Sequence, residues 1–124
     1  MTQPLALVLY DKLLPGSQLV NKLQDMNYRV QTVAEPSLLV ESAEQTKPLL
    51  VIADLESGRN EILAELGRLR QNSGTKHLPI IGFSRDDSEA LKKAAQDSGV
   101  TLFVTDAAIV NHLPQLLNQA LEVE

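Results

Sequence analysis

The sequence LLVIAD, residues 49–54, is the stretch from which the fold of this chain can be predicted. Its first five residues are all aliphatic, and an acidic residue, Asp54, follows them directly. A strand that is apolar on both faces must be covered on both sides, which is typical of a parallel strand between two layers of helices. The stretch therefore predicts a central buried strand whose carboxyl end carries Asp54.

Other segments of the chain have the character of strands as well. Residues 5–10 and 78–83 are apolar runs of the same kind, and they predict two more buried strands. Residues 29–33 alternate polar and apolar side chains, which favours a strand nearer an edge of the sheet. Residues 101–105 predict the fifth strand.

Amphipathic segments separate these strands. Apolar residues recur at helical spacing after Ser17, which we expect to cap the first helix. Pro36 suits the first position of a second helix that runs to about residue 46. We expect the remaining helices over three segments, namely residues 60–71, residues 87–98 with Gly99 as the stop, and a segment from residue 111 or 112 to residue 121, with Pro114 near its start.

The order of these elements indicates the class of fold. Strands that alternate with single helices pair in parallel through right-handed crossovers. Residues 1–124 are therefore expected to form a single α/β domain, with a doubly wound parallel sheet of five strands between two layers of helices. In such a sheet, ligands bind outside the carboxyl ends of the strands.

The composition excludes several classes of function. The 124 residues suit one domain with one core, and the net charge of −5 weighs against direct nucleic-acid binding, which needs a basic patch. The absence of cysteine excludes disulfides, thiolate catalysis and cysteine-ligated zinc. No apolar run is long enough for a signal peptide or a spanning helix, so we expect a cytoplasmic protein with no membrane partner.

Polar residues follow four of the five predicted strands. Asp11, Asp54, Ser84 and Asp106 come after the first, third, fourth and fifth strands, so we expect them at one edge of the sheet. Facing carboxylates repel each other unless a cation, a proton or a basic partner lies between them, and Mg²⁺ prefers oxygen ligands of this kind. Each of these residues can also be a simple turn or capping residue.

Over nearly its whole length, residues 5–121, the sequence resembles the receiver domain of two-component response regulators. The resemblance rests on Asp11, on Asp54, on residues 78–84 and on residues 99–104. It implies a flavodoxin-like (βα)5 fold with the strand order 2-1-3-4-5. It also implies a place in phosphorelay signalling.

The resemblance implies a role for each candidate residue. Asp54 would accept a phosphoryl group from a histidine kinase, and Ser84 would hydrogen-bond a phosphoryl oxygen. Asp11, Asp54 and Glu56 would bind Mg²⁺, which neutralises the charge that develops as the carboxylate attacks phosphorus.

The sequence also departs from the receiver family at positions that support this chemistry. Tyr10 stands where the family has the first of two adjacent acids, and Asp106 stands where it has a lysine. The second change alters the local charge by about two units and opposes a phosphoryl dianion at this edge. Residues 55–60 also lack the family's usual turn. Receivers with such losses, called atypical or pseudo-receivers, tend to bind proteins regardless of phosphorylation.

The leading hypothesis is therefore a stand-alone, non-enzymatic receiver-like module, with weak or absent phosphorylation of Asp54. Its expected partners are a histidine kinase or a downstream signalling protein. The surface formed by the fourth helix, fifth strand and fifth helix is the candidate interface, also for a homodimer. Because the resemblance uses nearly all of the chain, we expect no DNA-binding domain.

Two other classes of protein remain open. A flavodoxin-like domain that binds FMN would need a phosphate loop after the first strand, which residues 11–16 do not resemble. A cobalamin domain has a histidine where Leu13 stands. A hydrolase or transferase is disfavoured because no catalytic triad, P-loop or dinucleotide motif is present, and because His77 and His112 lie apart from any candidate nucleophile.

Overall fold

The computed structural model describes residues 4–10, 13–33, 35–55, 59–85 and 88–122. Two of the predicted Mg²⁺ ligands, Asp11 and Glu56, lie outside the described residues. The elements, in which η1 is a short 3-10 helix, follow one another as β1 (Leu5–Leu9), α1 (Leu13–Asp25), β2 (Arg29–Val33), η1 (Pro36–Leu38), α2 (Leu39–Thr46), β3 (Leu50–Asp54), α3 (Arg59–Gln71), β4 (Ile80–Ser84), α4 (Glu89–Asp97), β5 (Leu102–Thr105), α5 (Asp106–Asn111) and α6 (Leu113–Glu122).

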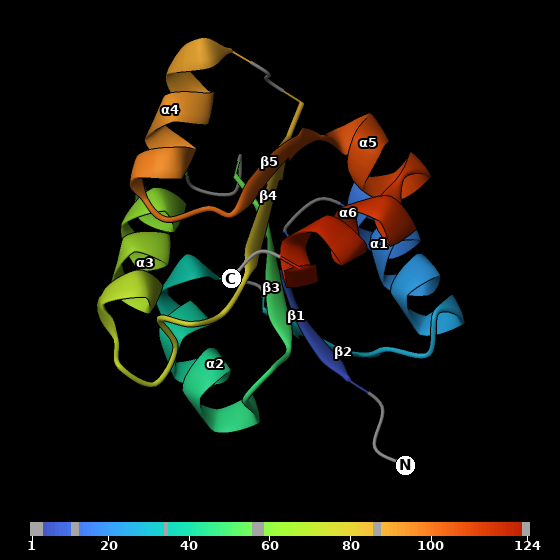
Figure 1. The fold of residues 1–124 in the computed structure, drawn as a ribbon, viewed down its shortest axis with the longest axis horizontal. Coiled ribbons are helices and arrows are strands. Elements are labelled where there is room, and N and C mark those ends of the chain that lie inside the picture. The colour runs from blue at the N-terminus through green and yellow to red at the C-terminus, as the bar shows by residue number, and fades with distance from the viewer. Residues whose placement is uncertain (1–3, 11–12, 34, 56–58, 86–87, 123–124) are drawn as a thin grey trace.

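The strands form one parallel sheet of five strands in the order β2-β1-β3-β4-β5. Helices α2, α3 and α4 cover one face of the sheet, and α1, α5 and α6 cover the other (Figure 1). The predicted fold class, a doubly wound α/β sandwich with strand order 2-1-3-4-5, is confirmed.

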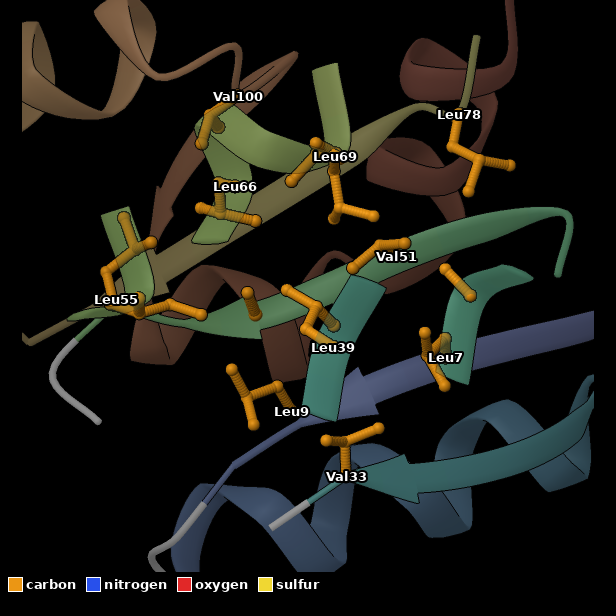
Figure 2. Close-up of a cluster of buried hydrophobic side chains, with 14 of the residues drawn as sticks. Leu7, Leu9, Val33, Leu39, Val51, Leu55, Leu66, Leu69, Leu78 and Val100 are labelled. Carbon is orange, nitrogen blue, oxygen red and sulfur yellow. The ribbon is translucent and has the colours of Figure 1, made fainter. Parts of the chain in front are cut away.

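The buried strands contribute side chains to the core on both faces of the sheet. Every residue of β3 and of β4 is buried, as the apolar runs predict. Because successive side chains of a strand point to opposite faces, Val51 packs in the cluster beside α2 and α3 (Figure 2), while Ile52 packs in the cluster beside α1 and α6. The edge strands β2 and β5 are more exposed.

The start of the first helix differs from the prediction. We expected Ser17 to cap it, but α1 already begins at Leu13, so Ser17 lies inside the helix. Pro15 falls in the first turn, where backbone N–H groups have no partner within the helix, so its missing N–H costs nothing there. The second helix opens at Pro36, as predicted, but as the 3-10 helix η1.

The end of the chain forms two helices where we predicted one. Helix α5 begins at Asp106, directly after β5, and α6 begins at Leu113 and corresponds to the predicted helix. The chain leaves the helical conformation at His112, with φ −123° and ψ 25°. Pro114 explains this break because a proline ring disfavours a continuous helix through the preceding turn. None of the described helices is long and apolar enough to cross a membrane.

Candidate functional site at the carboxyl ends of the strands

Asp54 is the last residue of β3, and its side chain lies in a buried position with a residue exposure of 2%. The next residue, Leu55, fixes this strand end, because it is buried in the cluster beside α2 and α3 (Figure 2) and its N–H donates to the Phe83 carbonyl at 2.9 Å. Gly82 makes room for Leu55: a Cβ at Gly82 would come within 2.9 Å of Leu55 Cδ1. The backbone at Asp54 is thus held by packing and by the β4 ladder.

Ser84 ends the neighbouring strand β4 and is completely buried. Asp54 pairs with Phe83, and Ser84 pairs with Thr105 of β5. β3 and β4 are neighbours in the sheet, so their last residues, Asp54 and Ser84, lie at adjacent strand ends. Adjacent strands are about 4.8 Å apart. The structure therefore brings these two candidate residues together at one edge of the sheet, which we call the rim.

Asp106 lies at the next strand end along the rim, as the first residue of α5, and is half-buried. The Thr105 hydroxyl accepts a hydrogen bond from the Ala108 N–H at 3.2 Å and caps this helix. An acid in the first turn is stabilised by the helix dipole. Asp106 therefore has a structural role that we had missed, although a threonine followed by an acid is a recognised signal for a helix start.

Tyr10 follows β1 and occupies the place of the family's first acid. It is half-buried and packs against the cluster beside α1 and α6. A phenol in this position contributes apolar contact area and does not supply the carboxylate oxygens that an acid would offer to Mg²⁺.

The predicted Mg²⁺ site rests on Asp11, Asp54 and Glu56, of which the structure describes only Asp54. Its carboxylate is a hard oxygen ligand of the kind that Mg²⁺ prefers. Within the described ranges, no three His, Cys, Asp or Glu side chains lie close enough together to hold a metal ion.

The rim can supply two kinds of chemistry. A buried carboxylate at Asp54 can act as a nucleophile, and a hydroxyl at Ser84 can donate a hydrogen bond to an oxyanion. The two histidines lie elsewhere and are exposed: His77 precedes β4 at the opposite end of the sheet, and His112 lies between α5 and α6.

No protein-family model and no curated protein matches the chain. Solved structures of the same fold do match. The chemotaxis protein CheY4 of Vibrio cholerae superposes with a TM-score of 0.85 at 19% identity, over 96% of this chain and 99% of that chain. The receiver domain of the sensor histidine kinase PA1611 of Pseudomonas aeruginosa, solved with magnesium in its active-site cleft, gives 0.86 at 17% identity over 97% and 98%.

A response regulator protein of Burkholderia multivorans is 25% identical, with a TM-score of 0.69 over 94% of this chain and 96% of that chain. The similarity thus extends over nearly the whole of each chain, and it includes the strand order and the two helical layers. By its architecture, the chain has the receiver-domain fold of response regulators.

Proposed function

We propose that this chain is a receiver-like signalling module that acts by binding other proteins, and that Asp54 is phosphorylated weakly or not at all. The observation that carries the proposal is the position of Asp106, at the strand end next to that of Ser84. The receiver fold supports a role in two-component signalling. The charges at the rim argue against efficient phosphorylation.

The reaction in question has simple charge requirements. A carboxylate oxygen of Asp54 would attack phosphorus, the leaving group of the donor would depart, and an acyl phosphate dianion would remain on β3. The resemblance implies a lysine near this dianion, but this chain has the carboxylate of Asp106 there. Unlike charges stabilise such a product and like charges destabilise it, so Asp106 lowers the yield of phosphorylated protein.

The remaining groups would give partial support to this reaction. Ser84, at the end of the neighbouring strand, would hydrogen-bond a phosphoryl oxygen. Mg²⁺, held by Asp11, Asp54 and Glu56, would supply positive charge when bound. With Tyr10 in place of the first of the two adjacent acids, this set has one carboxylate fewer than the family's pattern, so we propose weak metal binding.

Intact-mass spectrometry after incubation with acetyl phosphate or phosphoramidate and Mg²⁺ tests the proposal. We expect the unmodified mass to dominate, with at most a minor species heavier by one phosphoryl group. The Asp54→Asn variant is the control, since it keeps the shape of the side chain and removes the nucleophile. A nearly complete adduct on the unaltered protein that is lost in Asp54→Asn would contradict the proposal.

The proposed protein interface is the surface of α4, β5 and α5. All four residues of β5 are partly exposed, and α4 presents the cations Lys92 and Lys93 to solvent. A histidine kinase or a downstream signalling protein in the cytoplasm is the proposed partner, and a homodimer would use the same surface. No catalytic turnover is proposed for this chain.

A small-molecule domain remains the second candidate because flavodoxin-like sheets also bind cofactors at the carboxyl ends of their strands. The purified protein distinguishes the two candidates directly. Visible absorbance that stays with the protein through purification would favour a bound flavin or cobalamin over the signalling module.

A further inference from the structure

A groove lies at the amino-terminal end of the sheet, opposite to the rim. It consists of two cavities of about 330 Å³ and about 600 Å³, both of which His77 and Leu78 line. The last turn of α2 borders the first cavity, and the start of β5 borders the second. We call these two cavities together the basic groove. Its size is in the range of cavities that bind a peptide side chain or a small molecule.

Apolar side chains form much of the wall of the basic groove. Leu49, Leu78, Pro79 and Leu121 line the larger cavity. Leu49 is 42% exposed and is one of only two large hydrophobic side chains with high exposure among the described residues. Covering this leucine with another apolar side chain would remove unfavourable contact with water.

The charge of the basic groove is opposite to that of the whole chain. Among the described residues, its lining includes the cations Lys47, Arg70 and Lys76 and a single acid, Glu44. The chain as a whole carries 11 basic and 16 acidic residues and a net charge of −5. The Glu44 carboxylate already accepts a hydrogen bond from the Asn72 side chain at 2.9 Å. The groove therefore attracts negative charge, although the chain as a whole is acidic.

The turn that carries Lys76 and His77 is held in one conformation. The Arg70 guanidinium donates to the carbonyls of Lys76 and Gly99, at 2.5 Å and 2.8 Å, and to the Thr101 hydroxyl at 3.1 Å. A fixed turn loses little conformational freedom when a ligand binds. Arg70 donates one of these hydrogen bonds to the turn and two to the segment before β5, which leaves Lys47 and Lys76 as the described lining cations available to a ligand.

Lys47 is in a conformation that is unusual for a side chain of its type. It ends α2 in the left-handed region, with φ 51° and ψ 60°, where glycine is preferred. Replacing it with glycine would therefore relieve the backbone and remove a cation in one step. A Lys47→Gly variant is therefore expected to weaken ligand binding without lowering the stability of the fold.

From these features we infer that the basic groove binds an acidic peptide segment of a partner protein, in which leucines recur at every third or fourth position among aspartates or glutamates. The aliphatic wall suits leucine, and Lys47 and Lys76 suit flanking carboxylates. Among its described lining residues the groove has no aromatic side chain besides His77 on which a nucleic-acid base could stack, so a peptide fits better than RNA or DNA. The inference goes beyond the proposed function and does not depend on Asp54.

Fluorescence anisotropy with a labelled peptide tests the inference. The probe is a short peptide with leucine at every third or fourth position among glutamates, and its controls replace all glutamates with lysine or all leucines with serine. We expect saturable binding of the probe and not of either control peptide. This binding should weaken as the salt concentration rises from about 20 mM to about 500 mM, because the ion pairs are exposed. No binding of the probe at concentrations up to about 1 mM would overturn the inference.

Matched variants locate the binding site. In Lys47→Gly with Lys76→Gln we expect about five-fold weaker binding, since each exposed ion pair contributes a fraction of a kcal/mol. Lys22→Gln with Arg85→Gln removes the same charge at two exposed positions that do not line the groove, and should change the affinity less than about two-fold. Leu49→Ser should weaken binding about ten-fold through loss of apolar contact. Equal effects of the two double variants, or RNA bound more tightly than the peptide, would overturn the inference.

Discussion

At the scale of single residues, the sequence predicts the positions of some site residues better than their structural roles. Asp54 and Ser84 were placed correctly because each directly follows an apolar run, and runs of this kind form buried parallel strands. Asp106 was placed at the right strand end, but its role as the first residue of a helix was not recognised. Its role depends on the Thr105 cap, and we had assigned both residues to the strand and the loop after it.

Gly99 allows a test of packing at a single position. It has φ +99°, and a Cβ there would lie 2.2 Å from Arg70 Cγ. We expect Gly99→Ala to lower the free energy of unfolding by about 2–4 kcal/mol, through left-handed strain and steric overlap. Urea denaturation followed by circular dichroism measures this.

Gly67, in the middle of α3, is the matched control. A Cβ there meets no atom within 4 Å. Gly67→Ala should therefore raise the free energy of unfolding by about 0.5–1 kcal/mol, because alanine loses less conformational entropy in a helix. If both variants changed stability in the same direction, the account of Gly99 would be wrong.

The fold affects the ionisation of Tyr28. Partial burial raises its pKa above the ordinary value of 10.0. The unfolded chain loses this proton first, so the stability contributed by neutral Tyr28 is present below pH 10 and is lost as the pH rises toward the folded pKa. Ultraviolet titration of a Tyr10→Phe variant measures Tyr28 alone, and a midpoint at or below pH 10.0 would contradict this.

At the scale of the elements, the strands were easier to predict than the helix ends. Two-sided burial gives a strand a continuous apolar run, and this signal is local. The start of α1 and the break between α5 and α6 depend on small differences between alternative caps. Pro15 and Pro114 each fit more than one helix boundary, and the packing of the helix on the sheet decides between them.

The hydrogen bonds that Arg70 makes between neighbouring elements can be tested by substitution. Arg70 joins α3 to the turn before β4 and to the start of β5 through three hydrogen bonds. Burial lowers the pKa of its guanidinium, but the group stays charged at neutral pH. We expect Arg70→Met, which keeps the aliphatic stem, to cost about 1.5–3 kcal/mol of stability.

Thermal unfolding monitored by circular dichroism would show this loss. Lys92→Met is the control, since Lys92 is an exposed residue of α4 and its replacement should change stability by less than about 0.5 kcal/mol. If Arg70→Met were as stable as Lys92→Met, the hydrogen bonds of Arg70 would not hold the turn.

At the scale of the whole molecule, the fold does not determine the chemistry of the rim. The alternation of strands and helices predicts the sheet, and the structure confirms its order. Reactivity depends on a few charges that contribute little to folding. The same fold can therefore exist with or without efficient phosphorylation, and we propose that Tyr10 and Asp106 decide between these two cases.

The most direct measurement is the rate of phosphorylation of a double variant, Tyr10→Asp with Asp106→Lys, in acetyl phosphate and Mg²⁺. The variant restores the acid and the cation that the receiver family has at these positions, so we predict that it gains one phosphoryl group at least about ten-fold faster than the unaltered chain. Adding Asp54→Asn to the double variant should abolish the gain. Phosphorylation of the unaltered chain at the same rate as the double variant would contradict the account.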